Sequence, residues 1–296
     1  ESDFDLKADL LGVTVDLSDD TLTEVRVANK ESRCAEVAAS VDQVLDRGSL
    51  RAHEVASLFG RIQFMEGQLL GRMGRLALAE LRSLGTSGGY LKFGSTERRA
   101  FENLRERMLH GPPRSISTRP VGFNVVVFTD GACEPEGDSM RCSIGGVMYV
   151  ESSGSWSTRY FGCRLSDALV SDWSKSGKKH LIGPVELYAV VTARRCWKRF
   201  LDGARALFFV DHSGVHAACV NGSSHDKLWR GLLLKLESAD AFPMIGWYAR
   251  VPSQSNPSDA PSRGSCNFPI WGTVMRDHPL CCFSDAPLSP LDEMGD

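Results

Sequence analysis

An alternation of apolar runs and helix-patterned segments in the second half of the chain is the feature that most constrains the fold. Apolar runs bounded by turn residues predict strands at 124–129, 143–150, 156–161, 206–210 and 245–250. Segments with the helical apolar period predict helices at 185–201 and 213–236, and a short last helix follows Pro257. Strands and helices in this order indicate a mixed α/β sheet with flanking helices.

The first part of the chain has a different pattern. Residues 11–27 alternate around a Ser-Asp-Asp turn and predict a hairpin, and a helical pattern then runs from Lys30 to about Leu109. The string GPPRSISTRP has the Pro and Ser content of a linker. We therefore expect a hairpin at 1–28, a helical domain at 29–110, a linker at 111–120, an α/β domain at 121–264 and an irregular tail at 265–296.

The composition is that of an ordinary intracellular protein. With 296 residues, 42% of them hydrophobic and 24% charged, the chain can build one or two cores and is too apolar to be disordered. It has no run of 18 apolar residues and begins with polar residues, so we expect neither a spanning helix nor a secretory signal, and no membrane partner. Nine cysteines without a CxxC pair suit a reducing compartment, cytoplasmic or nuclear.

Positive charge is concentrated in the helical segment, although the formal net charge of the chain is -3. Residues 29–119 carry 15 Lys and Arg against 10 Asp and Glu. On a helical wheel, a narrow cationic and amide stripe lies beside the apolar face, formed by Arg61, Gln68, Arg72 and Arg75. These side chains suit phosphate and sugar oxygens, so the stripe is a candidate nucleic-acid contact. A solvated helix face explains the same pattern, and nearby glycines predict that the helix is interrupted.

Four carboxylates follow one another in the order Asp, Glu, Asp, Asp. Asp130 and Asp211 each end an apolar run, so we expect both at the carboxyl edge of the sheet, where active sites are common. Glu186 opens a helix, and Asp259 lies in the string SNPSDAPSR. Each acid alone is explained as a turn former or a helix cap. Together they predict a site for hard cations, Mg²⁺ or Mn²⁺, of the kind that supports phosphodiester cleavage by two metal ions.

The strings around these acids resemble a known family. FTDGACE, GPVELYAVVTA, FFVDHSGVHAACVNGSS and ARVPSQSNPSDAPSRG are similar to the ribonuclease H domain that follows reverse transcriptase in retrotransposons, most of all those of the DIRS-like type. This resemblance spans about 121–264. LLGVTVDLSDDTLTEVRVANK, RAHEVASLFGRIQF and GRMGRLALAEL resemble the hairpin and the thumb or connection helices that follow the polymerase palm.

The resemblance implies a ribonuclease H-like mixed five-stranded sheet and a ribonuclease H activity, the hydrolysis of the RNA strand in an RNA/DNA hybrid. It implies that Asp130 bridges two Mg²⁺ ions, that Glu186 binds one and faces the cleaved strand, that Asp211 helps to position the attacking water, and that Asp259 holds the second ion. The implied partners are the RNA/DNA hybrid and the upstream polymerase portion of a reverse transcriptase. Candidate backbone contacts to the hybrid are Gly131, Ala132 and Cys133.

The chain departs from the family pattern in three places. Many relatives have a His in the loop before the final acid, and this chain has none between Val251 and Asp259. His212 stands where related elements often have Asn, and we expect its ring to point away from the metal site. No Tyr-x-Asp-Asp motif of a polymerase occurs, so we expect a portion of a longer protein that does not synthesise DNA by itself.

Two other classes of function remain open from the sequence. The chain is alternatively a degenerate or repurposed retroelement fragment that binds nucleic acid, or acts as a scaffold, without cleavage. The retained acids favour the enzyme, because a scaffold gains nothing from carboxylates that repel one another. An integrase or transposase of the same superfold would need Glu as its last acid, and this chain has Asp259 there.

Overall fold

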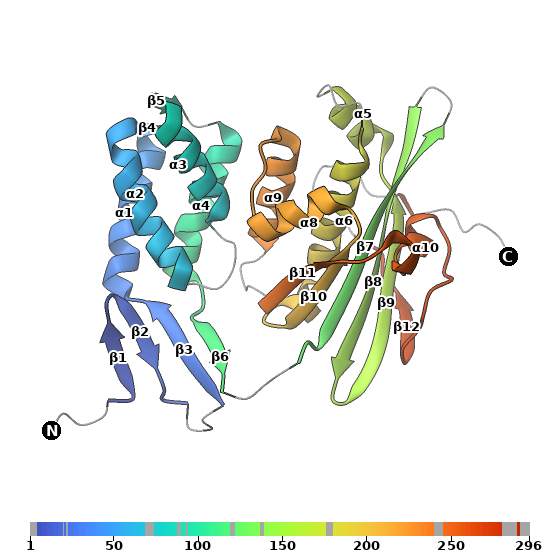
Figure 1. The fold of residues 1–296 in the computed structure, drawn as a ribbon, viewed down its shortest axis with the longest axis horizontal. Helices are drawn as coiled ribbons and strands as arrows, with labels where there is room; N and C mark the ends of the chain where they lie inside the picture. The colour runs from blue at the N-terminus through green and yellow to red at the C-terminus, as the bar shows by residue number, and fades with distance from the viewer. Residues whose placement is uncertain are drawn as a thin grey trace. The chain divides into compact units, whose positions relative to one another are not determined.

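The protein divides into two compact units, residues 1–122 and residues 123–239 with 244–296. The computed structural model describes residues 5–19, 21, 23–68, 74–87, 90–92, 94–118, 122–136, 139–175, 180–239, 245–279 and 289–290. Figure 1 shows the elements of each unit. None of the helices in these ranges is long and apolar enough to cross a membrane.

The first unit combines a small antiparallel sheet with four helices. Its sheet has the order β1-β2-β3-β6, formed by Lys7–Leu10, Val13–Asp16, Glu24–Asn29 and Arg114–Ser117. Its helices are α1 (Glu31–Arg47), α2 (Ala52–Gln68), α3 (Arg75–Ser87) and α4 (Ser95–His110), and β4 (Ser49–Arg51) pairs with β5 (Tyr90–Lys92). Buried apolar side chains of α1, α2, α3 and α4 form its core.

Strand β6 corrects the expectation of a linker at 111–120. Its residue Ile116 pairs with Val25 of β3 in an antiparallel ladder. The Pro and Ser content of this segment suggested a loop, but a short edge strand needs little apolar side-chain content. The ladder to β3 supplies its backbone hydrogen bonds.

The second unit contains the mixed α/β sheet that the sequence predicts. The five strands expected are β7 (Val125–Glu136), β8 (Ser139–Ser152), β9 (Ser155–Arg164), β10 (Arg205–Val210) and β11 (Ile245–Arg250). Their order is β11-β10-β7-β8-β9. Strands β7, β10 and β11 are parallel, whereas β8 is antiparallel to both of its neighbours.

Helices lie on both faces of this sheet. They are α5 (Asp167–Lys175), α6 (Ile182–Cys196), α7 (Lys198–Leu201), α8 (Ser213–Asn221), α9 (Lys227–Ala239) and α10 (Asp259–Ser262). A Cβ at Gly146 would meet the rings of Phe161 and Trp197, whereas one at Gly145 would lie 2.6 Å from the carbonyl oxygen of Ser258, just before α10. Successive strand residues face opposite sides. The α6 region and α10 therefore cover opposite faces (Figure 1).

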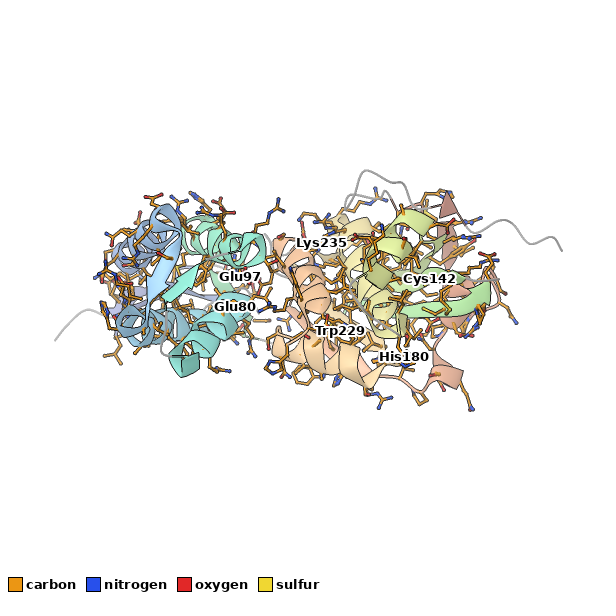
Figure 2. The ribbon with its side chains drawn as sticks, turned by 90° about the horizontal axis from the view of Figure 1, so that it is seen from above. Glu80, Glu97, Cys142, His180, Trp229 and Lys235 are labelled. Atoms are coloured by element: carbon orange, nitrogen blue, oxygen red, sulfur yellow. The ribbon has the colours of Figure 1, made fainter. Side chains whose placement is uncertain are left out.

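Helix α6 is the most deeply buried helix segment of this unit and carries Glu186. Its residues from Gly183 to Arg194 are all buried, and it packs against β7 and α9. Gly183 leaves room for the indole of Trp229 on α9, because a Cβ at position 183 would lie 2.4 Å from a carbon of that ring. Trp229 is labelled in Figure 2. Packing from both the sheet and α9 fixes the position of α6, and hence the position of Glu186.

The segment after α10 differs from the expected irregular tail. Strand β12 (Thr273–Arg276) runs parallel to β9, and β13 (Ser289–Pro290) pairs with β9 antiparallel. Asp277 accepts hydrogen bonds from Nε of Arg159 at 2.7 Å and from the indole nitrogen of Trp197 at 2.8 Å. The sequence gives no sign of this because the strand is short and exposed, and its partners lie more than 70 residues away.

Candidate active site

Asp130 lies inside β7, where the parallel partner β10 ends. Pairing between β10 and β7 stops at Phe209 and Phe128, while β7 continues to pair with β8 as far as Glu136. The strand therefore does not end at Asp130, as the sequence suggested, although the carboxylate does lie at the edge of the parallel part. The residue is 3% exposed, and Ser262 donates a hydrogen bond from its hydroxyl to Oδ2 of Asp130.

Glu186 approaches the same place from the first part of α6 and is 4% exposed. The close approach of helix and strand depends on Gly131, where a Cβ would lie 2.7 Å from the backbone nitrogen of Glu186 and 2.9 Å from Cγ1 of Val185. The backbone of Gly131 also hydrogen-bonds to the Glu186 carboxylate. The Gly after Asp130 is thus required by packing against α6.

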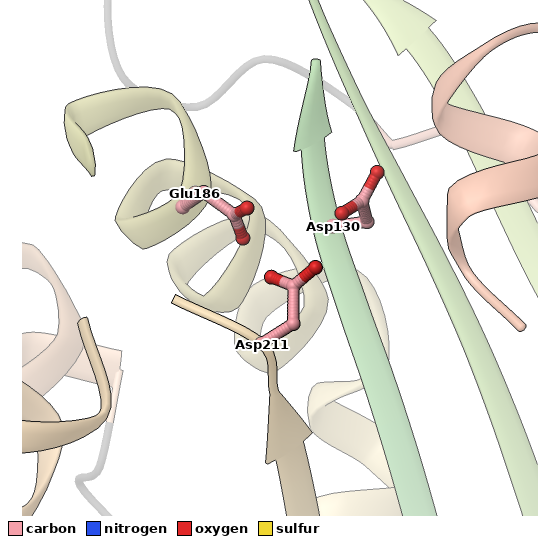
Figure 3. A group of neighbouring side chains, drawn as sticks. All are labelled: Asp130, Glu186 and Asp211. Atoms are coloured by element: carbon pink, nitrogen blue, oxygen red, sulfur yellow. The ribbon is translucent and has the colours of Figure 1, made fainter. Parts of the chain in front are cut away.

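Asp211 directly follows β10 and completes a group of three acids. Asp130, Glu186 and Asp211 each offer an oxygen, and these oxygens lie within 4.8 Å of one another (Figure 3). The carbonyl oxygen of Asp211 accepts a hydrogen bond of 2.8 Å from Arg250 of the neighbouring strand. The two parallel strands and α6 therefore bring the first three sequence-predicted acids together.

The electrostatics of this group call for positive charge. Burial, together with the carboxylates of Asp211 and Asp259, raises the pKa of Asp130 to about 7, against the opposing effect of the hydrogen bond from Ser262. Burial also raises the pKa of Glu186 to about 10, with contributions from Asp130 and Asp211. Removing like charges from water disfavours their ionised forms until protons or cations compensate.

The residues of this group fit a divalent metal ion. Oε2 of Glu186 and Oδ1 of Asp211 are buried and accept no hydrogen bond from a donor group in the described part of the chain, while the two carboxyl groups lie within hydrogen-bond reach of each other. Buried polar atoms are normally satisfied, so two such oxygens on neighbouring acids indicate a missing ligand. An all-oxygen donor set suits Mg²⁺ or Mn²⁺.

Asp259 lies apart from the group of three. It begins α10, and its side chain is 47% exposed. Its Oδ1 accepts a hydrogen bond of 2.9 Å from Nε of Arg263, and Arg263 also donates to Oε1 of Glu134 at 3.1 Å. The alternative reading of Asp259 as a helix cap is not what the structure shows, because Ser258 occupies the N-cap position.

Three residues that the sequence did not single out hold α10 beside Asp130. Asn256 donates from Nδ2 to the carbonyl oxygen of Thr129 at 3.1 Å, and its Oδ1 accepts from the hydroxyl of Ser258 at 2.6 Å. Ser258 and Ser262 are fully buried. All three belong to the string NPSDAPSR, so the motif itself was the available signal, but only the fold reveals which atoms they bind.

The candidate hybrid contacts on β7 are largely enclosed. Gly131 and Ala132 are buried, and Cys133 is half-buried with its sulfur 3.5 Å from that of Cys142 on β8. The backbone of Gly131 binds Glu186, and Ala132 and Cys133 pair with Ser143 and Cys142 of β8.

His212 is used to begin helix α8. Its Nδ1 accepts hydrogen bonds from the backbone nitrogens of Gly214 at 3.1 Å and Val215 at 3.3 Å. The ring packs edge-on against Trp229, with centroids 6.2 Å apart. Nδ1 of His212 therefore serves as the N-cap of α8.

The cationic stripe of the first unit does not lie on a single helix. Arg61 lies on α2 and Arg75 on α3, and Gly74 between the two helices has a φ of 97°. Arg61 pairs with Glu36 at 3.3 Å and Arg75 with Glu66 at 3.8 Å. Arg72 and the side chain of Gln68 lie outside the described residues. The helix is therefore interrupted between Arg61 and Arg75, as the nearby glycines predict.

No protein-family model and no curated protein matches the chain. A similar solved structure is the ribonuclease H1 of the halophilic archaeon Halobacterium salinarum, with 17% identity and a TM-score of 0.33 over 48% of this chain and 96% of that chain. Another is LC11-RNase H1 in complex with an RNA/DNA hybrid, with 14% identity and a TM-score of 0.32 over 48% of this chain and 96% of that one. A foamy viral protease-reverse transcriptase in complex with double-stranded DNA has 12% identity and a TM-score of 0.28, over 83% of this chain and 38% of that chain. None of the three identifies the substrate of this chain.

Proposed function

We propose that the second unit is a metal-dependent endonuclease that hydrolyses the RNA strand of RNA/DNA hybrids. The observation that carries this proposal is the group formed by Asp130, Glu186 and Asp211, with two buried oxygens that accept no hydrogen bond from a donor group in the described part of the chain. The order Asp, Glu, Asp, Asp and the string NPSDAPSR support a ribonuclease H domain of a DIRS-like retroelement reverse transcriptase. An upstream polymerase portion is the proposed partner of the first unit.

Each acid has its own proposed task. Asp130 lies between α6 and α10, so it is the residue best placed to serve both metal positions. Glu186 and Asp211 would complete the first position, and Asp259 would complete the second. When bound, Mg²⁺ or Mn²⁺ would polarise the scissile phosphate and acidify the attacking water.

The surrounding residues keep the acids in place. Ser262 fixes one oxygen of Asp130, and Gly131 does the same for Glu186 through its backbone. Burial of Asp130 and Glu186 strengthens every electrostatic interaction they make, because the local dielectric constant is lower than that of water. Recognition of RNA would rest on the 2′-hydroxyl and the shape of the hybrid.

Cleavage of a labelled RNA/DNA hybrid in Mg²⁺ tests the proposal. We expect the parent to release RNA fragments and Asp130→Asn to release at least about a hundredfold less, as expected on loss of a group that stabilises the transition state. Asp172→Asn, an exposed acid on α5, is the matched control and should cleave like the parent. Circular dichroism verifies that all three proteins are folded.

Each outcome has a distinct meaning. A folded parent that leaves the hybrid intact while binding it supports the alternative, a fragment that binds without cleavage. The lack of a His before Asp259 and the engagement of Asp259 by Arg263 are the observations that favour this alternative. Undiminished cleavage by Asp130→Asn would refute the site.

A further inference from the structure

Arg263 forms two ion pairs beside the proposed metal site. Its guanidinium donates hydrogen bonds from Nε to Oδ1 of Asp259 at 2.9 Å and from Nη1 to Oε1 of Glu134 at 3.1 Å. Glu134 lies on β7, four residues beyond Asp130. All three side chains are about half exposed, at 52%, 47% and 53% for Arg263, Asp259 and Glu134.

The guanidinium of Arg263 supplies the positive charge that balances the carboxylate of Asp259. In the described part of the chain, the acids whose carboxylate oxygens lie within 4.8 Å of one another are Asp130, Glu186 and Asp211. Asp259 does not belong to this group. Both Asp259 and Arg263 nevertheless influence the pKa of Asp130, in opposite directions, so both lie within electrostatic range of it. Asp259 and Glu134 carry two negative charges against one positive charge, which leaves the cluster attractive to a further cation.

We propose that Arg263 is a displaceable counter-ion of Asp259, which a divalent cation releases so that it can bind a phosphate of the nucleic-acid substrate. Arg263 is thus a positioning residue that couples occupancy of the second metal position to grip on the substrate backbone. The inference rests on the proposed function of the same site.

The physical properties of the contact suit such an exchange. Exposed ion pairs contribute little stability, so a cation can replace the guanidinium at small cost. An Arg side chain offers five N–H donors in a planar fork that matches a phosphate, and two of its nitrogens are now used by carboxylates. Hydrogen bonds from Asn256 to Thr129 and from Ser262 to Asp130 hold the backbone of α10. The exchange therefore requires only movement of the Arg263 side chain.

Calorimetric titration with Mn²⁺ in the absence of nucleic acid gives the first test. We expect Arg263→Ala to bind the weaker of two ions about two- to fivefold more tightly than the parent, because the competing ion pair is gone. In an Asp259→Asn background, Arg263→Ala should have no such effect, since the double-mutant cycle isolates the contact between these two residues. Arg164→Ala is the matched control, because Arg164 forms a similar ion pair of 2.7 Å with Glu136 of the same strand as Glu134.

Binding of a fluorescent RNA/DNA hybrid gives the second test. In Ca²⁺, a divalent ion that also takes carboxylate oxygens, we expect Arg263→Ala to bind the hybrid about three- to tenfold more weakly. The slope of log affinity against log salt should fall by about one, as on loss of one phosphate contact. In chelator, where the carboxylates hold the guanidinium, parent and variant should bind equally. Arg263→Lys should recover part of the affinity because it keeps the charge without the fork.

The two measurements move in opposite directions, which a merely structural role of Arg263 would not produce. Unchanged Mn²⁺ affinity of Arg263→Ala, or an equal loss of hybrid affinity in Ca²⁺ and in chelator, overturns the inference while cleavage by the parent still supports the nuclease. Absence of any Mn²⁺ binding by the folded parent overturns the proposed function itself.

Discussion

The side-chain amide of Asn256 donates a hydrogen bond of 3.1 Å to the carbonyl oxygen of Thr129, the residue before Asp130. This contact joins the loop that carries Asp259 to the strand that carries Asp130, across 127 residues of sequence. The Oδ1 atom of Asn256 accepts hydrogen bonds from the backbone nitrogen and the hydroxyl of Ser258. One amide therefore links the backbone segments that carry the two acids.

Asn256→Ala should loosen this loop and destabilise the protein. Loss of a buried amide that makes three hydrogen bonds costs about 1–3 kcal/mol because its former partners are left unsatisfied. Urea unfolding measures the loss, and Asn267→Ala, an exposed Asn in the following segment, should change stability by less than about 0.5 kcal/mol. Equal stability of the two variants would mean that the contact with Thr129 contributes nothing.

Gly131→Ala should damage the site through packing alone. The added Cβ would lie 2.7 Å from the backbone of Glu186, so α6 or β7 must shift, at a cost of about 1–3 kcal/mol. Gly231→Ala on α9 is the control, because a Cβ there meets nothing within 4 Å and should stabilise the helix by about 0.5–1 kcal/mol. Thermal unfolding with and without Mg²⁺ distinguishes loss of stability from loss of metal binding.

Stability in the presence of chelator should fall as pH rises. The pKa of Asp130 rises from 3.8 to about 7 in the folded chain, so its protonation stabilises the fold fully below pH 3.8 and no longer above pH 7. In this window the folded state holds an Asp130 proton that the unfolded state has released, so Asp130 alone lowers the free energy of unfolding by about 1.4 kcal/mol per pH unit. Glu186, whose pKa is raised to about 10, adds to the decline. Urea unfolding at pH 5, 6 and 7 measures the slope, which should be shallower in Asp130→Asn.

Mg²⁺ should reverse this trend. Protons and metal ions compete for the same oxygens, so the rise in melting temperature caused by Mg²⁺ should be larger at pH 8 than at pH 5.5. Glu186→Gln, which removes a buried carboxyl whose pKa is raised to about 10, should lose most of the Mg²⁺ effect while remaining folded. A rise that is the same at both pH values, or that persists in Glu186→Gln, would place the metal elsewhere.

Asp277→Ala should strongly destabilise the second unit, although Asp277 lies outside the group of acids. Asp277 binds Arg159, which is 7% exposed, and the indole of Trp197, which is fully buried. Removing one partner of a buried ion pair costs about 3–5 kcal/mol because the other charge remains buried. Urea unfolding of this variant and of Asp172→Asn provides the comparison.

The sequence predicted the elements that bury much apolar surface. Strands β7 and β10 and helix α6 appear as strong apolar patterns, and Asp130, Glu186 and Asp211 stand at recognisable positions beside them. Strands β6 and β12 were missed because short edge strands carry little apolar signal. Their pairing with β3 and β9 is decided by tertiary contacts.

The hydrogen bonds and ion pairs of the site could not be predicted from sequence patterns, because they too are decided by tertiary contacts. Arg263 and Ser262 lie in a quoted motif, but their partners Glu134 and Asp130 are more than 120 residues away. The division of the stripe between α2, which carries Arg61, and α3, which carries Arg75, is a local effect that the glycines of this segment did predict. Local periodicity cannot reveal contacts between residues so far apart in the chain.

The pairing of β12 with β9 has a practical consequence for dissecting the chain. A fragment that ended at residue 264, where the family resemblance stops, would leave the backbone groups of β9 that now bind β12 without partners. An unpaired strand edge invites association with other chains, so such a fragment should aggregate. The segment after residue 264 thus covers the edge of β9 and prevents it from pairing with other chains.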